Sequence, residues 1–478
     1  MATAGLTVRV PPGTPPYRAI LKLATPTVLA MLSQSVVNEI DVVFFSRLPC
    51  PESSNGQAAL LPSLIVVWLF GGALSAISVG AQAITARRVA EGNRKAAGAV
   101  LANAAWFSLL AGGFASILGL LLLPKILGLM ITVPEVRDVA VSYSRWRMLG
   151  IISMVMTMAI KAFFDGVGKT HVHLVAAVVM NTFNVLFCWM FIFGNLGAPR
   201  MGAPGAGLSA FLATWIGLFI MIFFAGLTRR DYEPLHWSNL SRKLTWDILK
   251  LSVPAGIATV VLMVGFGLFS KVVGLLDAAG AAQGGVVETV VEKCGASEAV
   301  NSAATTNIVA ILKLTFTACM AFGTATATLV SQCLGARQPD EAERYGWASV
   351  RLGVLIFSVV GLCEGLLFTP QIVGFITQSE AVRAAAMFPM RMMGIVTPVI
   401  AVAMILSEAL FGAGNTRFVA VAQFLLVFGV LVPVAYVAGV RAGLGLVGIW
   451  GAACVYSALA ALTMAAKFKG GGWKRIVL

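Results

Sequence analysis

Long apolar segments dominate this chain and limit what it can fold into. About twelve such segments follow one another with short polar connections, and each approaches the roughly 20 apolar residues that a helix needs to cross a bilayer. Only 11% of the residues are charged and 59% are hydrophobic, so polar groups could not cover the surface of a soluble globule. These features exclude a soluble enzyme, a disordered chain and a fibrous repeat. They predict an all-α polytopic membrane protein.

The predicted spans divide evenly between two halves of the chain. In the first half they cover residues 23–46, 58–85, 97–123, 139–163, 172–193 and 205–227. In the second half they cover residues 251–275, 308–330, 348–368, 386–411, 419–440 and 444–466. We therefore predict an N-terminal six-helix lobe (1–227), a charged cytoplasmic linker (228–250) and a C-terminal six-helix lobe with a basic cytoplasmic tail (251–478).

Short motifs repeat between the halves. Three pairs recur in the same order, namely Leu21–Pro26 with Leu249–Pro254, Arg147–Ile151 with Arg391–Ile395, and Gly166–Thr170 with Gly412–Thr416. Because each half holds an even number of spans, both copies enter the bilayer in the same direction. This is the organisation of transporters built from parallel repeats.

The basic residues mark one side of the membrane. The net charge is +14, and Lys and Arg gather in the loops 87–95 and 228–250 and in the tail 467–475. Cytoplasmic loops carry such an excess of positive charge, so we predict that both termini are cytoplasmic. The positive charge then reflects orientation and contact with anionic membrane lipid, and we expect no nucleic-acid partner.

The first predicted helix carries a polar face. Gln34, Asn38 and Asp41 stand at positions i, i+4 and i+7, which places them on one side of an otherwise apolar helix. Ionisable groups inside a span are costly and are functional candidates, so we predict that Asp41 faces a cavity and exchanges protons. The alternative is that Asp41 only solvates the outer end of the helix. Pro26 removes a backbone hydrogen bond and can bend the inner end.

Other polar groups within the predicted spans allow two interpretations. Asn181 and Asn184, in the fifth span, either join neighbouring helices or line a cavity. Lys271, in the seventh span, either reaches a cavity or extends to the membrane surface, and for Lys313 in the eighth we favour the surface. Glu408, near the end of the tenth span, is expected to be solvated at the interface.

Several runs together resemble a known family. The run Gly323–Ala336, followed by Glu341–Arg344, resembles the eighth-helix signature of multidrug and toxic compound extrusion (MATE) transporters, and Gly80–Ala96 is its first-half relative. The family's connection between the fifth and sixth helices is similar to Asn184–Phe187, Phe191–Gly194 and Gly202–Ala206. Asn38–Asp41 matches the place where the family's first helix carries its aspartate. The resemblance covers nearly the whole chain.

This resemblance implies a secondary antiporter that exports organic, often cationic, compounds in exchange for H+ or Na+, with no cofactor. It implies a V-shaped pair of lobes around a cavity that opens alternately to each side. Asp41 would be the coupling acid and Asn184 part of its site, while Pro26 would match the family's bending point. The cavity candidates are Gln34, Asn38, Asn181 and Lys271. We expect a monomer in the bacterial inner membrane.

Two positions depart from the family pattern. Cys188 stands where many prokaryotic members carry a second acid on the fifth helix. The seventh span lacks the glutamate that other members have there, and Lys271 is its only charge. Because a small cation needs several oxygen ligands and compensating charge, these departures favour H+ over Na+.

A flippase for lipid-linked precursors, from the same superfamily, is the main alternative. Such proteins tend to line the cavity with cationic residues for phosphate groups, and Lys271 and Lys313 are intramembrane cations. A membrane enzyme would need a cluster of His, Asp or Cys near one surface, and a channel would more naturally show charged rings or a filter sequence. The sequence displays neither pattern, so we expect no enzymatic activity.

Overall fold

The computed structural model describes residues 16–49, 51–131, 133–233, 239–282, 289–291, 297–377 and 379–477. Within these ranges, 11 helices are long and apolar enough to cross a membrane. The number rises to 12 if the bent pair α6 (Pro134–Leu149) and α7 (Ile151–Val167) counts as one span. The prediction of an all-α polytopic membrane protein is confirmed.

The N-terminal half begins with α1 (Pro16–Ser46). The next span consists of α2 (Glu52–Val67), the π-helical turn η1 (Trp68–Gly72), α3 (Ala73–Ser75) and α4 (Ile77–Ala90). After it come α5 (Arg94–Met130), the α6–α7 pair, α8 (His171–Phe193), the turn η2 (Asn195–Gly197), α9 (Ala203–Leu227) and the short α10 (Arg229–Tyr232).

The C-terminal half begins with α11 (Arg242–Ala282), which is followed by an antiparallel pair of short strands, β1 (Thr289–Val291) and β2 (Ser297–Ala299). Then come α12 (Val300–Gly335), α13 (Pro339–Leu362), the π-helical turn η4 (Cys363–Leu367), α14 (Thr369–Ile376) and α15 (Glu380–Gly412). The last elements are α16 (Thr416–Leu426), η5 (Val427–Leu431), α17 (Val432–Tyr436), η6 (Val437–Arg441), α18 (Gly445–Lys469) and η7 (Gly472–Arg475).

Two spans differ from their predicted form. The helix α11 begins at Arg242 rather than at residue 251, so part of the predicted linker is helical. A helix can continue into water with polar residues on its surface, and hydropathy does not mark such an end. The fourth span is not one straight helix, because α6 and α7 meet at Gly150 with a bend of 43°.

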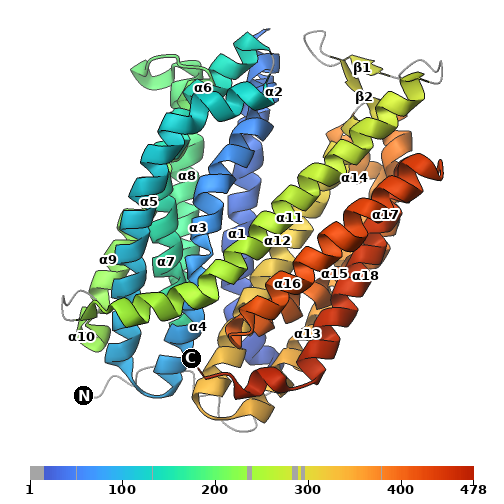
Figure 1. The fold of residues 1–478 in the computed structure, drawn as a ribbon. Coiled ribbons are helices and arrows are strands. Elements are labelled where there is room, and N and C mark those ends of the chain that lie inside the picture. The colour runs from blue at the N-terminus through green and yellow to red at the C-terminus, as the bar shows by residue number, and fades with distance from the viewer. Residues whose placement is uncertain are drawn as a thin grey trace.

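The helices form two lobes that touch at one end and diverge toward the other (Figure 1). Helices α1–α9 lie in the N-terminal lobe and α12–α18 in the C-terminal lobe, while α11 runs from the closed end of the first lobe to the open end of the second. The start of α1 and the end of α18 lie at the touching end, which we call the closed end. The β1–β2 pair lies at the opposite, open end. This is the two-lobed V that the family resemblance implies.

At the closed end, α4 of one lobe crosses α12 of the other. Gln82 of α4 donates from Nε2 to Thr328 Oγ1 of α12 at 2.8 Å. In return, Ser331 Oγ of α12 donates to the Ala83 carbonyl of α4 at 2.8 Å. Because buried polar groups are stable only when hydrogen-bonded, these reciprocal bonds hold the lobes in one register.

Inside the C-terminal lobe, two helices cross through glycine. A Cβ added to Gly394 of α15 would lie 2.7 Å from the Gly361 carbonyl oxygen of α13, and the Cα of Gly365 lies closer still. Small residues let helix backbones approach this closely. No side chain fits at the crossing unless the two helices move apart.

We expect Gly394→Ala to lower the free energy of unfolding by about 1–3 kcal/mol, the usual cost of overpacking. The change is measured as a lower thermal-unfolding midpoint in detergent. Gly113→Ala, in α5, is the matched control, because nothing lies within 4 Å of its added Cβ and alanine is the better helix former. Equal effects of the two substitutions would contradict the tight crossing.

Candidate functional site

Asp41 lies in a buried site between three helices of the N-terminal lobe. Its side chain is 7% exposed. The Tyr143 hydroxyl of α6 donates to Oδ2 at 3.3 Å, and the Cys188 thiol of α8 donates to Oδ1 at 3.5 Å. Donors aimed at a carboxylate stabilise its ionised form, which would be costly in a dry interior without them.

Cys188 connects Asp41 to Asn184. The two α8 residues are one turn apart, and Cys188 Sγ lies 3.8 Å from Asn184 Oδ1. Both are buried, and the single thiol hydrogen can point to either oxygen. Cys188 therefore connects the two predicted coupling residues, Asp41 and Asn184. It stands at the position where the family resemblance places a second acid in many members.

A cation lies next to Tyr143, which donates to Asp41. Arg147 of α6 stands over the Tyr143 ring, with its Cζ 5.9 Å from the ring centroid. The sequence motif Arg147–Ile151 repeats in the second half, but the repeat alone did not connect Arg147 with Asp41.

Asn181, Gln34 and Lys271, which are also predicted cavity residues, have surroundings different from those of Asp41. Asn181 is buried and donates from Nδ2 to Ser33 Oγ of α1 at 2.9 Å, so it joins α8 to α1. Gln34 is half-buried, and Lys271 is exposed on α11. The side chain of Asn38 lies outside the described residues.

Pro26 lies within α1 and does not end it. Near it, the hydroxyls of Thr27 in α1 and of Thr170, which precedes α8, both donate to the Leu23 carbonyl, at 3.0 and 3.3 Å. The carbonyl that loses its helical donor to Pro26 is that of Lys22, four residues earlier, so these hydroxyls add bonds to the neighbouring carbonyl and do not replace the missing one. The role of Pro26 as a bending point stays a prediction.

The sequence-based search missed the buried residues Lys161 and Asp165 and the half-buried Glu364. Lys161 and Asp165 of α7 form an ion pair with Nζ and Oδ2 2.6 Å apart and side chains 9% and 2% exposed. Glu364 of η4 accepts a hydrogen bond from Thr315 of α12. Lys161 and Glu364 fall inside predicted spans, so the rule that selected Asp41, an ionisable residue in an apolar run, could have selected both.

Glu408 was expected to be solvated at the membrane surface, but its side chain is only partly exposed. A Cβ added to Gly323 of α12 would lie 2.7 Å from Glu408 Cγ, so the side chain packs directly on that helix. Glu408 is therefore half-buried between helices near the closed end.

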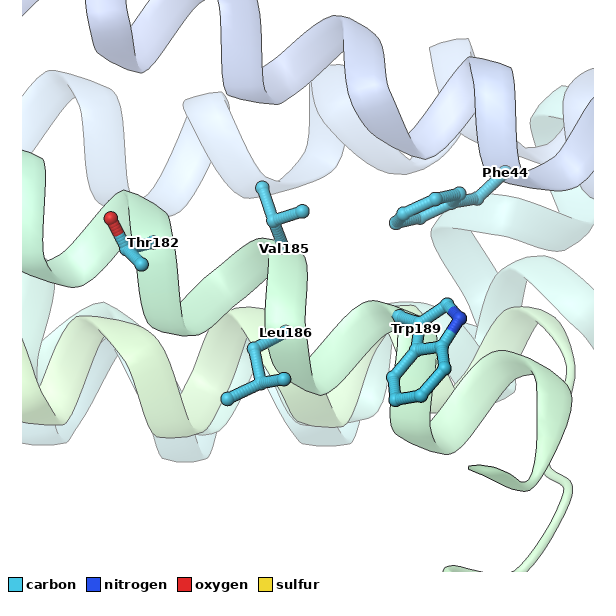
Figure 2. Close-up of a pocket in the computed structure, with 5 residues that line it drawn as sticks. All are labelled: Phe44, Thr182, Val185, Leu186 and Trp189. Carbon is cyan, nitrogen blue, oxygen red and sulfur yellow. The ribbon is translucent and has the colours of Figure 1, made fainter. Parts of the chain in front are cut away.

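A groove with an aromatic lining lies close to Asp41 along α1. It has a volume of about 510 Å³ and is lined by Phe44, Thr182, Val185, Leu186 and Trp189 (Figure 2). Phe44 follows Asp41 by one turn of α1, and the other four share one side of α8. Aromatic faces in an apolar groove suit flat apolar groups and organic cations.

We expect Tyr143→Phe to lower the thermal-unfolding midpoint in detergent, because the substitution removes a hydroxyl that donates to the buried Asp41 carboxylate. A hydrogen bond to a charged group is worth about 1.5–3 kcal/mol. The control is Tyr436→Phe, because Tyr436 is partly exposed on α17. An equal effect of the two substitutions would contradict the Tyr143–Asp41 contact.

The described geometry can be compared with known proteins. A family model for MatE matches residues 26–190 and 293–437. The chain is 24% identical over 451 residues to a probable multidrug resistance protein NorM of Thermotoga maritima, covering 91% of this chain and 88% of that protein. It is 24% identical over 428 residues to the multidrug resistance protein PmpM of Pseudomonas aeruginosa, covering 88% and 84%.

Solved structures share the fold. One is a MOP superfamily transporter from Pyrococcus furiosus, with a TM-score of 0.84, 20% identity and 96% of both chains covered. Another is a multidrug resistance MATE transporter in an outward-facing conformation, with a TM-score of 0.84, 20% identity and coverage of 96% and 97%. Because the matched family segments span more than half of the chain, this protein belongs to the MATE family of membrane transporters, not to a family of enzymes.

Proposed function

We propose that this transporter exports organic compounds, cationic or amphipathic in character, in exchange for H+ by alternating access. The observation that carries the proposal is the buried Asp41 carboxylate, which meets the Tyr143 and Cys188 donors in an otherwise apolar lobe. Intramembrane carboxylates in such surroundings mark ion pathways and proton relays. Relatives described as multidrug resistance proteins support export of small organic molecules.

Proton binding at Asp41 can drive transport only if the two lobe arrangements differ in proton affinity. Where water reaches the carboxylate, the ionised form is solvated. Where the lobe is closed and dry, the ionised form is costly and protonation is favoured. Protonation and deprotonation would then bias the lobes toward opposite arrangements, and the substrate would move in the direction opposite to the proton.

The surroundings of Asp41 favour H+ over Na+. Tyr143 and Cys188 present hydrogens to the carboxylate, whereas a bound Na+ would need oxygen lone pairs in their place. Among the described residues, no three His, Cys, Asp or Glu side chains are grouped as ligands for a metal ion. Na+ coupling is therefore the weaker alternative.

The groove between α1 and α8 is our candidate for part of the substrate site. Its aromatic members, Phe44 and Trp189, come from different helices and face the same space (Figure 2). Organic cations bind to aromatic faces through the ring quadrupole. A relative motion of α1 and α8 would change this groove and the Asp41 site together.

The closed end is proposed to face the cytoplasm of a bacterial cell. It holds the basic loop at residues 87–95 and the tail with Lys467, Lys469, Lys474 and Arg475, and cytoplasmic segments carry this charge excess. Both termini would then be cytoplasmic, and the described arrangement would be open to the outside. We propose a monomer, because each chain contains both lobes.

A flippase for lipid-linked precursors is the second candidate. Lys271 is exposed on α11 and Lys313 is half-buried on α12, and cations in a span suit phosphate groups. A solved structure of similar fold is described as having a binding pocket of reversed polarity that suggests a different function. Binding of a lipid pyrophosphate rather than an organic cation would favour this candidate.

We expect Asp41→Asn to insert and fold but to lose proton-driven transport. The test is uptake of a fluorescent organic cation into proteoliposomes under separately imposed pH and Na+ gradients. Glu52→Gln is the matched control, because Glu52 is an exposed carboxylate of the same lobe that pairs with Arg200. Normal pH-driven uptake by the Asp41→Asn variant would refute the assignment of the coupling acid.

We expect Trp189→Ala to raise the KM for an aromatic cation about tenfold. The substitution removes a cation–π contact together with the apolar area that the indole ring covers. Proton coupling should persist, because Asp41 keeps both donors. Phe114→Ala is the control, since Phe114 is largely exposed on α5. If both variants raise KM equally, the groove is not the substrate site.

A further inference from the structure

Two side chains at the closed end reach from one lobe into a turn of the other. Arg87 of α4 donates from Nη2 to the Ala413 carbonyl, at 2.8 Å, in the turn after α15. Gln332 of α12 donates from Nε2 to the Gly166 carbonyl, at 2.9 Å, near the end of α7. Both acceptors lie in the glycine motif that repeats between the halves. The internal repeat therefore relates the two contacts.

Arg87 has a second acceptor, in the C-terminal tail. Its Nη1 donates to the Ile476 carbonyl at 2.6 Å. The residue is 6% exposed, and its Nε has no partner among the described atoms. A buried guanidinium without acceptors is costly, whereas a neutral amide such as that of Gln332 costs much less. Gln332, which makes the equivalent contact in the other half of the repeat, carries no charge. The Ile476 carbonyl of the tail therefore compensates a charge that is present only at Arg87.

The tail itself is anchored on the C-terminal lobe. The Trp473 ring is fully buried and stacks on Phe468 with centroids 4.5 Å apart, and Trp473 Nε1 donates to the Phe468 carbonyl at 2.7 Å. Lys474 Nζ lies 2.7 Å from Glu343 and 2.9 Å from Asp340 of α13. Hydrogen bonds to these two carboxylates raise the pKa of Lys474. The tail is therefore fastened to one lobe while its last described residues reach the other.

We propose that the C-terminal tail and Arg87 form a latch that holds the closed end shut. Opening this end requires Arg87 to leave the Ala413 and Ile476 carbonyls at once. A contact made in only one of two arrangements shifts the population toward that arrangement. The latch goes beyond the proposed transport function, because it depends only on relative motion of the lobes and not on the substrate or the coupling ion.

The test measures how often the closed end opens. Ala83 lies one turn before Arg87 on the same face of α4 and is 1% exposed, so a cysteine placed there reacts with a maleimide only after opening. In the Ala83→Cys protein, Arg87→Gln should raise the labelling rate about tenfold, as the loss of one hydrogen bond to a charged donor would give. Mass spectrometry of the peptide that contains residue 83 gives the rate.

A chain shortened after Gly471 should show a similar increase. Combining it with Arg87→Gln should add little, because both changes remove the same contact. If the shortened chain does not fold, the double substitution Trp473→Ala with Lys474→Ala replaces it, since together these changes remove both anchors of the tail. Lys469→Ala is the matched control. It removes one positive charge from the same segment at an exposed site and should leave the rate unchanged.

Three results would overturn the latch. The first is unchanged labelling in a folded Arg87→Gln protein. The second is unchanged labelling when the tail of a folded protein is shortened or released. The third is a combined variant whose labelling rate rises by the product of the two separate increases, which would mean that Arg87 and the tail act separately.

Discussion

Hydrogen bonds across the α4–α12 crossing are the contacts on which the two-lobed arrangement depends. In the dry interior of a membrane protein, each buried polar group needs a partner, so Gln82, Ser331 and Gln332 join the lobes only in a specific register. Nearer the middle of the molecule, Ser35 of α1 donates to Thr317 of α12 at 3.2 Å. These are neutral bonds, which water can replace when the lobes separate. An interface made of such bonds fixes how the lobes fit together, yet it still allows them to separate.

Helix α1 connects this seam with the Asp41 site. Its first turns pack into the core of the C-terminal lobe, where Ile20 and Leu23 lie with Leu329. Farther along the same helix, Asp41 is held by α6 and α8 of its own lobe. In the proposed mechanism, a change of charge at Asp41 would act on a helix that contacts both lobes, and this would connect proton binding with lobe movement.

Most of the fold could be predicted from the chain alone, because lipid admits so few backbone solutions. The apolar runs located the spans, and the run Gly323–Ala336 indicated the family that the comparisons confirm. Hydropathy indicated the fourth span but does not register its bend at Gly150. Lys161 and Glu364 could have been predicted as candidates, because each is an ionisable residue in an apolar run, but they were missed. Arg87 was assigned only to a basic loop, although it is buried against two carbonyls of the other lobe.

The sequence by itself determined the class of protein, the number of spans within one and an acid on the first helix. These follow from composition and periodicity, which are local properties of the chain. The tertiary structure alone decided that Tyr143 and Cys188 donate to Asp41, and that the tail lies against Arg87. Each of these contacts joins residues more than a hundred positions apart. Such pairs depend on how helices pack and bend, and no local pattern in the chain encodes that.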